Sequence, residues 1–249
     1  MVIRLLVLVG LVLVGAPAFS QKADSVKKEA APVKKKSFRP DIPGNIIVEF
    51  GFNFKNGVVP ADFQKSFWGS RTVNFYYQYP IRLFKTKFSV VPGVGLSLER
   101  FKLSNNYTLP FTADPDGTYP LIPGTDIYPG SIERSFIVNN YVEAPIELRF
   151  DTNPDDIARS VSVSFGYRIG LLYDSFTKVD YLDKGEDKTM KDIQRHGINL
   201  TRQTLYGRVG YGGFGLVLYY NTTPLFAPGK GPEKTAMNSI TIGITVSGF

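Results

Sequence analysis

Apolar and polar residues alternate with a period of two through most of the chain from Asn45 onward. The closing segment SITIGITVSGF is a clear case, because Ile240, Ile242, Ile244 and Val246 are separated by Thr and Gly residues. A period of two predicts half-buried β-strands, whereas the apolar positions of an amphipathic helix recur every three or four residues. The pattern predicts eight strands, at residues 45–54, 72–83, 88–99, 136–150, 160–173, 200–211, 214–220 and 239–249.

The connections between these predicted strands alternate between long and short. The long ones are 55–69, 104–132, 177–198 and 222–237, and the short ones are 84–86, 151–159 and 212–213. Outer-membrane barrels have an even number of tilted strands of about ten residues, with long loops outside and tight periplasmic turns. We therefore predict an all-β protein, an up-and-down, eight-stranded antiparallel transmembrane β-barrel of the outer-membrane type.

The two faces of the predicted strands differ in chemistry, although periodicity alone does not say which face points inward. Charges of both signs among small polar residues suit a narrow lumen filled with ion pairs, and this leaves the apolar face for lipid. A soluble ligand-binding barrel of the lipocalin kind is the alternative. An eight-stranded barrel has room only for its own side chains, which argues against a solute channel. The charged residues of the polar face are Glu49, Arg82, Glu99, Glu143, Glu147, Arg149, Arg168 and Arg208.

The amino-terminal segment has the features of a secretory signal peptide. Arg4 supplies a positive charge, an apolar run follows at 5–14, and Ala18 and Ser20 are small residues suited to a cleavage site. The apolar run is shorter than the roughly 20 residues that a transmembrane helix needs. We predict a signal peptide at residues 1–20, and localisation in the outer membrane of a Gram-negative cell after its cleavage.

Residues 21–44 form a second segment of distinct composition, rich in Lys, Ala and Pro. The stretch 22–39 carries seven Lys or Arg residues against Asp24 and Glu29, so most of the net charge of +7 lies here. Such a segment is predicted to be a disordered basic periplasmic linker, with contact to anionic lipid or cell wall as the alternative. The remainder is close to neutral, so nucleic acid is not an expected partner. The predicted barrel takes up residues 45–249.

The last predicted strand ends on an aromatic residue, Phe249. Because the assembly machinery of the outer membrane reads an aromatic carboxyl-terminal residue, we expect this machinery, together with outer-membrane lipid, to be a partner of the chain. Phe249 is one position out of phase with the apolar residues of its strand. A bulge at Ser247 and Gly248 would restore the phase.

Several segments resemble the PorT-like outer-membrane β-barrel proteins of the Bacteroidetes group. They are AFSQ at 18–21, YVEAPIELRF at 141–150, YGRVGYGGFGLVLYYNTTPLFAPGKGP at 206–232 and SITIGITV at 239–246. The likeness covers residues 45–249 and implies an eight-stranded barrel in the outer membrane. Some members of the family are associated with type IX secretion and gliding, and the resemblance implies no catalytic residues.

An outer-membrane barrel enzyme acting on lipid or peptide is an alternative function. Such chemistry commonly uses a His base beside a Ser nucleophile or an Asp partner, and the only His is His196, with Asp192 or Ser175 as candidate partners. A solvated loop His beside Gly197 accounts for the same residues, so no catalytic residue is predicted. No cofactor or metal site is predicted either, because the chain lacks Cys and DTNPDD at 151–156 lacks the Gly and Glu of a calcium loop.

The Gly-rich GYGGFG at 210–215 has no Lys and is followed by a strand pattern, so it is predicted to be a tight hairpin and not a phosphate loop. DTNPDD is likewise predicted to be a turn. The segment DYLDKGEDKTMKD at 180–192 is highly charged and is predicted to be a mobile loop.

The long connection at 104–132 is the most distinctive surface. Between Leu103 and Ile132 it contains no Lys or Arg, but three Asp, several aromatic residues and five Pro. We predict that this stiff, aromatic loop folds as a lid over the barrel mouth, with packing on a protein partner or a sugar as the alternative. The predicted function is a non-enzymatic structural or loop-mediated interaction component of the cell envelope, with an envelope or secretion protein as the partner of this loop.

Overall fold

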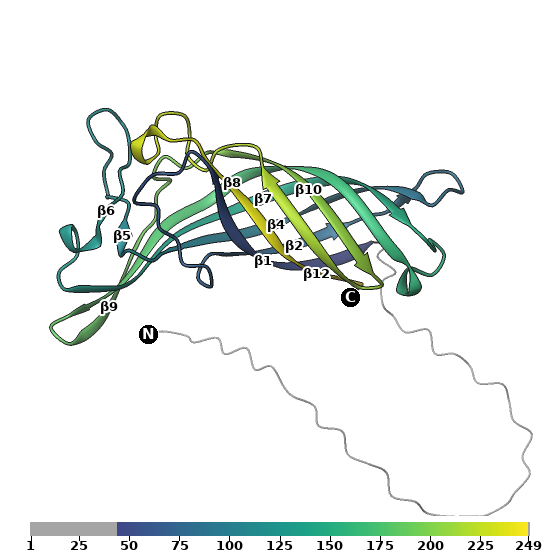
Figure 1. Ribbon diagram of the computed structural model, residues 1–249, viewed down its shortest axis with the longest axis horizontal. Coiled ribbons are helices and arrows are strands. Elements are labelled where there is room, and N and C mark those ends of the chain that lie inside the picture. The colour runs from purple at the N-terminus through teal and green to yellow at the C-terminus, as the bar shows by residue number, and fades with distance from the viewer. Residues whose placement is uncertain (1–43, 249) are drawn as a thin grey trace, which may run out of the picture. The chain divides into compact units, whose positions relative to one another are not determined.

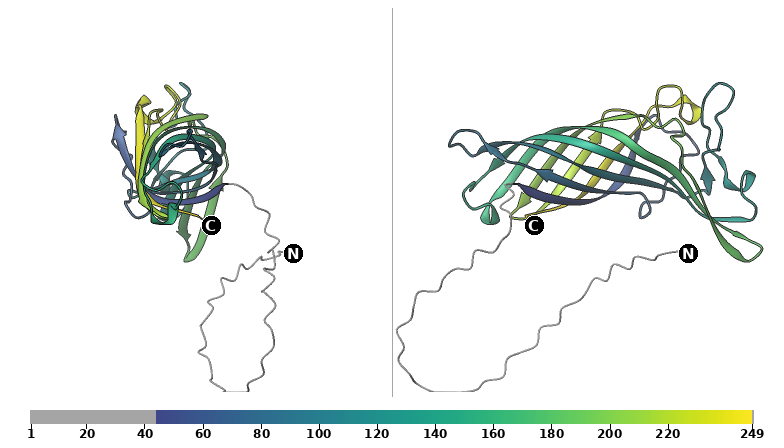
Figure 2. Two further views of the ribbon diagram at one scale, coloured as in Figure 1. Left: turned by 90° about the vertical axis from the view of Figure 1, so that its right-hand side faces the viewer. Right: turned by 180° about the vertical axis from the view of Figure 1, so that it is seen from behind.

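Eight antiparallel strands form a closed β-barrel in the computed structural model, which describes residues 44–248 (Figure 1). The barrel strands pair with their neighbours in chain order, and β12 pairs with β1 to close the ring, which is seen end-on in Figure 2. The predicted up-and-down, eight-stranded antiparallel barrel is confirmed. The strands are β1 (Asn45–Gly57), β2 (Arg71–Gln78), β4 (Phe88–Leu103), β7 (Ser131–Asp151), β8 (Val161–Asp183), β10 (Thr201–Tyr211), β11 (Phe214–Asn221) and β12 (Met237–Ser247).

Shorter elements lie in the connections. They are the strands β3 (Ile81–Arg82), β5 (Tyr107–Thr108), β6 (Ile122–Pro123) and β9 (Glu186–Asp192), and the 3-10 helices η1 (Gly124–Asp126), η2 (Ile157–Arg159) and η3 (Pro232–Lys234). Within residues 44–248, no helix has the length and apolar character needed to cross a membrane.

The barrel presents apolar side chains outward and polar side chains inward. Along β8, for example, Val163, Phe165 and Ile169 are exposed, whereas Ser164 and Arg168 are buried. The assignment of the two faces from the sequence pattern is therefore correct. Because each barrel strand is paired on both sides, the ring leaves no open sheet edge along the barrel itself.

All long connections lie at one end of the barrel, here called the loop end, and all short ones at the other, the turn end (Figure 1). At the turn end, Tyr211 pairs with Phe214 across Gly212 and Gly213, and Gly212 has a φ of +58°. This is the tight hairpin predicted for the Gly-rich segment. DTNPDD also forms the predicted turn, which η2 completes.

The closing strand of the barrel starts and ends as a regular member of the sheet. Its apolar residues Ile240, Ile242 and Ile244 pair with Phe54, Phe52 and Phe50 of β1. Phe249, the predicted signal peptide at 1–20 and the linker at 21–44 apart from Gly44 lie outside the described residues. The predictions made for those segments stay predictions.

The second predicted strand, 72–83, is interrupted, contrary to expectation. β2 ends at Gln78, and only the short β3 resumes pairing with β4 after Pro80, which has no N–H to donate to a ladder. Arg82 in β3 therefore lies at the turn end, where its guanidinium pairs with Asp155 at 2.7 Å. The prediction that Arg82 belongs to the lumen is wrong.

The third long connection, 177–198, is largely β-structure, contrary to the mobile loop predicted at 180–192. β8 continues to Asp183 and pairs with β9, while β7 begins at Ser131 and pairs with the same extension of β8. These segments form a three-stranded sheet, here called the outer arm, that projects beyond the barrel (Figures 1 and 2). The charged residues thus belong to an ordered hairpin.

Local chemistry explains the hairpin at the tip of the outer arm. Lys184 and Gly185 both have positive φ, at 53° and 83°, which matches the two-residue turns that favour right-twisted hairpins. Across the two strands, Lys188 pairs with Asp183 at 2.6 Å, and the Thr189 hydroxyl donates to the Asp180 carboxylate at 2.7 Å. Charges of opposite sign therefore face each other across the pair.

A bulge marks the point where β8 leaves the barrel. Asn140 of β7 pairs with Asp174 and Tyr141 pairs with Leu172, so Tyr173 is an extra residue in β8. Beyond this bulge, the buried residues of β8 fall on odd positions, as at Ser175, instead of even ones. The bulge shifts which side chains of β8 face inward.

Acid is expected to loosen the outer arm. Burial alone raises the pKa of Asp180, but hydrogen bonds from Thr189 and Lys178 and the charges of Lys178 and Arg134 outweigh it, so the pKa lies below its usual value. The ionised carboxylate then stabilises the arm above the unfolded-state pKa of about 4, and this contribution is lost as the pH falls through the lower folded-state pKa.

Hydrogen exchange of the β9 amides, corrected for intrinsic rates, measures this loosening. In the wild type, the protection of the β9 amides should fall as the pH drops below about 4. In Asp180→Asn, these amides should be less protected than in the wild type at neutral pH, and acid should change their protection little. Equal protection of the wild type and the variant at neutral pH would contradict the assignment to Asp180.

Candidate functional site

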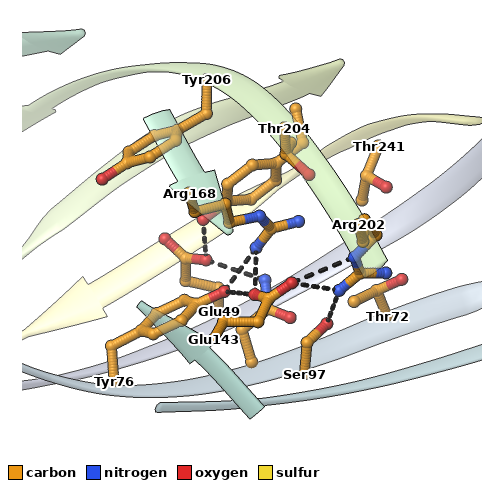
Figure 3. A network of polar contacts seen from close by, with 12 residues as sticks. Glu49, Thr72, Tyr76, Ser97, Glu143, Arg168, Arg202, Thr204, Tyr206 and Thr241 are labelled. Atoms are coloured by element: carbon orange, nitrogen blue, oxygen red, sulfur yellow. Dashed lines mark hydrogen bonds and ion pairs between the residues drawn. The ribbon is translucent and has the colours of Figure 1, made fainter. Parts of the chain in front are cut away.

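The lumen of the barrel holds a network of buried charged side chains, shown in part in Figure 3. They come from five different strands, and none of them is more than 8% exposed. In most soluble proteins such residues are almost never fully buried unless they are paired. The members are Glu49 (β1), Glu99 (β4), Glu143 and Glu147 (β7), Arg168 (β8), and Arg202 and Arg208 (β10).

Glu143 is the centre of this network. Its carboxylate accepts from Arg168 at 2.9 Å and from the Arg202 Nε atom at 3.0 Å. The Tyr76 hydroxyl also donates to Glu143, and Arg168 Nη1 in turn donates to the Tyr76 oxygen. One carboxylate thus connects β2, β7, β8 and β10 across the barrel (Figure 3).

A second group lies closer to the turn end. Arg208 bridges Glu49 at 2.7 Å and Glu147 at 2.8 Å. The Tyr206 hydroxyl donates to Glu147 at 3.1 Å, and the Tyr219 hydroxyl donates to Glu49. Each of these two carboxylates therefore binds Arg208 and one tyrosine.

A third group lies closer to the loop end. Arg202 reaches Glu99 at 3.3 Å and donates to the Ser97 hydroxyl at 2.7 Å. Its guanidinium also lies 4.0 Å from the centre of the Tyr141 ring, and that of Arg168 lies 3.9 Å from the Tyr219 ring. Both arrangements are cation–π contacts, which stabilise a desolvated guanidinium.

The charges of the network compensate each other. With Arg149, which donates to Glu147 at 3.0 Å, four arginines face four glutamates. Small residues leave room for the large ones: a Cβ at Gly166 would lie 2.4 Å from the Tyr206 ring. The arrangement joins the strands and fills the lumen with paired groups.

Side-chain parity along the predicted strands identifies most of this network. Glu49, Glu99, Glu143, Glu147, Arg149, Arg168 and Arg208 were expected in the lumen, and the structure brings them together there. Arg202 was missed, although it has the same parity as Arg208 in β10. Tyr206 and Tyr219 were missed because a tyrosine suits either face of a barrel strand, and parity was the signal that could have placed them.

Little space remains in the lumen beside these side chains. A cavity of about 40 Å³ at the turn end is bordered by Arg149, Arg208 and Ser164. A second, of about 10 Å³, lies beside Glu99, Tyr141 and Arg202. One water needs roughly 10–15 Å³ of such volume, so these cavities hold a few waters and not a solute.

A hydrophobic cluster closes the barrel at the loop end. It combines inward-facing strand residues with residues of the long connections, so that loops and barrel share one small core. Phe63 and Phe101, for example, contact each other edge to face with ring centres 5.7 Å apart. This cluster, here called the loop-end plug, consists of Phe63, Phe101, Leu103, Leu109, Leu121, Ile137, Ile198, Leu225, Phe226 and Met237.

The 104–132 connection contributes Leu109 and Leu121 to the loop-end plug, and both are buried. It is also bonded to the last long connection, because the Tyr119 amide donates to the Lys230 carbonyl at 2.9 Å. Gly130, with a φ of +96°, lets the connection lie directly against the outer arm, where an added Cβ would be 2.0 Å from the Leu182 carbonyl oxygen. The connection is the lid that its composition predicted.

His196 lies under this lid and is 2% exposed. Its Nε2 atom is 2.8 Å from the Asp192 carboxylate, and its Nδ1 atom is 2.9 Å from the Gln194 carbonyl oxygen. Of the two candidate partners, Asp192 is therefore in contact, whereas the Ser175 hydroxyl donates to Asn139. Tyr119 packs edge to face on the imidazole, with ring centres 5.6 Å apart.

Both hydrogen-bond partners of His196 lie at and just beyond the end of β9, and the lid contacts the ring through Tyr119. The prediction that His196 is solvated is wrong, because residues of the lid cover its ring. Within residues 44–248, no group of three or more His, Cys, Asp and Glu side chains is placed to share a metal ion.

Comparison with known proteins gives similarity in solved structures only. No protein-family model and no curated protein sequence matches the chain. The attachment invasion locus protein Ail of Yersinia pestis, solved with the heparin analogue sucrose octasulfate, is 11% identical, covers 83% of this chain and 100% of its own, and gives a TM-score of 0.33. Neisserial surface protein A is 10% identical, covers 82% of this chain and 96% of its own, and gives a TM-score of 0.31.

The N-terminal β-barrel domain of Pseudomonas aeruginosa OprF is 9% identical, covers 83% of this chain and 98% of that domain, and gives a TM-score of 0.26. At these values the similarity carries no conclusion on function, and the fold assignment depends on the strand pairing of the chain itself. The resemblance to PorT-like proteins stays a prediction.

Proposed function

We propose that this chain is a non-enzymatic outer-membrane β-barrel protein that acts through its loop end and does not conduct solutes. The observation that carries the proposal is the division of side chains, with apolar residues outside and a charged network inside. An apolar exterior is unfavourable in water and favourable in hydrocarbon. A closed barrel also pairs the backbone groups that lipid cannot satisfy. The signal peptide predicted at 1–20 supplies the route of export.

The soluble alternative has less support. A soluble barrel that binds an apolar ligand needs an apolar interior and a polar exterior, which is the reverse of the arrangement here. The filled lumen argues against transport as well, since the paired arginines and glutamates occupy the space that a solute would need.

Two measurements test the membrane location. The full chain, expressed with its export signal, should stay in the membrane pellet after carbonate extraction. Detergent-solubilised protein should migrate faster on gels before heating than after, as folded barrels do. Recovery of the mature chain in the soluble periplasm, or the absence of the gel shift, would contradict the proposal.

An arginine on the barrel exterior is expected to destabilise the protein. Leu216 on β11 is 66% exposed in the outward face, and Leu216→Arg should lower the free energy of unfolding by about 2–4 kcal/mol if this face contacts the bilayer core. Met190→Arg, on β9 of the outer arm, is the matched control and should change it by about 0.5 kcal/mol or less. Denaturant unfolding from lipid vesicles measures both, and equal effects would show that lipid does not cover Leu216.

The loop end is the part of the protein that we expect to bind a partner. The lid and the outer arm present ordered backbone at this end, and Phe111 of the lid remains 43% exposed. The partner would be an envelope or secretion protein, and in the finer form of the proposal a component of type IX secretion. Assembly into the membrane would use β12, which forms the closing seam with β1.

A photocrosslinking residue placed at Phe111 tests this partner in intact cells. The matched control is Phe84, which is 93% exposed but lies in a connection at the turn end. The proposal expects an identified envelope protein to be captured from Phe111 and not from Phe84. Capture of a type IX secretion component supports the finer form, and no capture from Phe111 would count against a loop-mediated role.

A further inference from the structure

Two arginines lie side by side on the outward face of the barrel, where apolar residues predominate. Arg71 at the start of β2 is the direct cross-strand partner of Arg100 on β4. Both belong to the outward row, because Glu99 beside Arg100 and Thr72 beside Arg71 are buried in the lumen. Like charges that face each other across a strand pair destabilise a sheet, so an anion close to both arginines would stabilise this pair.

The protein does not supply that anion. Within residues 44–248, neither guanidinium forms an ion pair, and the Arg100 Nε atom is buried without a hydrogen-bond partner. The neighbouring Glu99 carboxylate points into the lumen and binds Arg202. Arg100 is instead held in place by the ring of Phe136, whose centre lies 5.4 Å from its guanidinium carbon.

A groove starts at the two arginines and runs along apolar side chains. It has a volume of about 470 Å³, and it is bordered by Phe50, Val73, Leu98 and Val138 together with Arg71, Arg100 and Glu99, whose carboxylate is turned to Arg202 in the lumen. In the strand register, Phe50, Val73 and Leu98 form one row, and the arginines lie in the next row toward the loop end. A molecule that fits would carry an anionic head above an apolar chain.

Aromatic residues indicate the depth of the arginines. Phe52 is the cross-strand partner of Arg71 on β1, and it stacks on Phe67 with ring centres 4.8 Å apart. Trp68, 73% exposed, packs edge to face on Phe52 at 5.6 Å. Tryptophan gathers at the boundary between lipid and water. Arg71 and Arg100 therefore lie at the level of lipid headgroups and not at the bilayer centre.

We propose that Arg71 and Arg100 bind a phosphate group of a lipid of the outer leaflet, lipid A, whose acyl chains lie in the groove below. Guanidinium groups suit this role because their planar N–H donors match phosphate oxygens in pairs. Lys102, two residues beyond Arg100 on the same face of β4, adds a third cation on the loop side. The proposal rests on the membrane location proposed above.

Native mass spectrometry of the full chain in detergent tests the site. Wild-type protein is incubated with phosphorylated lipid A, with dephosphorylated lipid A or with sodium phosphate. Arg71→Gln/Arg100→Gln should retain phosphorylated lipid A at least about tenfold more weakly than the wild type, because it loses the charge-assisted hydrogen bonds of both guanidinium groups. Lys85→Gln/Arg159→Gln, two exposed residues at the turn end, removes the same charge and should bind as the wild type does.

Dephosphorylated lipid A should bind the wild type as weakly as phosphorylated lipid A binds the Gln variant. Arg71→Lys/Arg100→Lys, which keeps both charges, should bind more tightly than the Gln variant. Equal retention of the two lipids, equal retention by the wild type and the Gln variant, or displacement by an equal concentration of inorganic phosphate would overturn the site.

The gel shift is recorded on every sample. Its loss in the wild type would refute the membrane location, whereas its presence in all samples means that a difference in lipid retention comes from the two arginines and not from unfolding.

Discussion

Replacing Glu143 with Ala is expected to lower the free energy of unfolding by about 3–5 kcal/mol. Glu143 binds Arg168, Arg202 and the Tyr76 hydroxyl at once, and its removal leaves two buried guanidinium groups without their main partner. The cost arises chiefly from uncompensated charge. It should therefore exceed the cost of losing a single neutral hydrogen bond, which is about 1 kcal/mol.

Denaturant unfolding from lipid vesicles measures this loss, and Trp68, the only tryptophan, is a fluorescent reporter. Glu133→Ala is the matched control, since Glu133 is an exposed residue of the same strand, β7. A combined change of Glu99, Glu143, Arg168 and Arg202 to Met should restore part of the stability, because it removes two acids and two bases together and buried ion pairs are often replaceable by apolar groups of similar size. A loss below about 1 kcal/mol for Glu143→Ala would show that the network is hydrated and weak.

Phe101→Ala in the loop-end plug is expected to destabilise the protein by about 3–5 kcal/mol. The Phe101 ring is fully buried and contacts Phe63 of the first long connection, so the substitution leaves a cavity between the barrel and that connection. Phe84→Ala, at the exposed turn position, should stay within about 0.5 kcal/mol of the wild type. A small effect of Phe101→Ala would mean that the loops do not share a core with the barrel.

Single-channel recording in planar bilayers tests whether the loop-end plug also blocks the passage of ions through the barrel. We expect no stable ion conductance from Phe101→Ala, because the ion pairs of Glu143 and Arg208 still fill the lumen beneath the plug. Stable conductance steps in this variant would show that the plug, and not the network, blocks the barrel.

The arrangement of the barrel follows closely from the sequence because alternation is a local property. Each residue of a strand such as β8 has its face set by its parity, and a filled lumen requires partners such as Arg168 and Glu143 to carry opposite charges. Closure of the ring follows from the requirement that backbone groups in hydrocarbon be paired within the protein, and the order of the strands from the lengths of the connections. These features need no knowledge of distant contacts.

Where prediction failed, the structure depends on a local break of that pattern or on distant contacts. Pro80 ends β2 by removing one donor, and the inserted Tyr173 changes the parity of β8. The hairpin turn at Lys184 and Gly185 was overlooked because its strands are charged on both sides. His196 is buried by Tyr119, a residue far away in sequence, and no local signal predicts that contact.

The barrel strands differ in length, and this difference sets how far the outer arm extends from the lipid surface. β8 has 23 residues, or roughly 75 Å of extended chain at about 3.3 Å per residue, whereas a tilted strand crosses a bilayer with about 9–11 residues. Around half of it is therefore available to hold the tip of the hairpin away from the lipid surface. Because ladder hydrogen bonds fix that distance, a protein that docks at the tip would meet it at a set height above the headgroups, as on a stiff spacer.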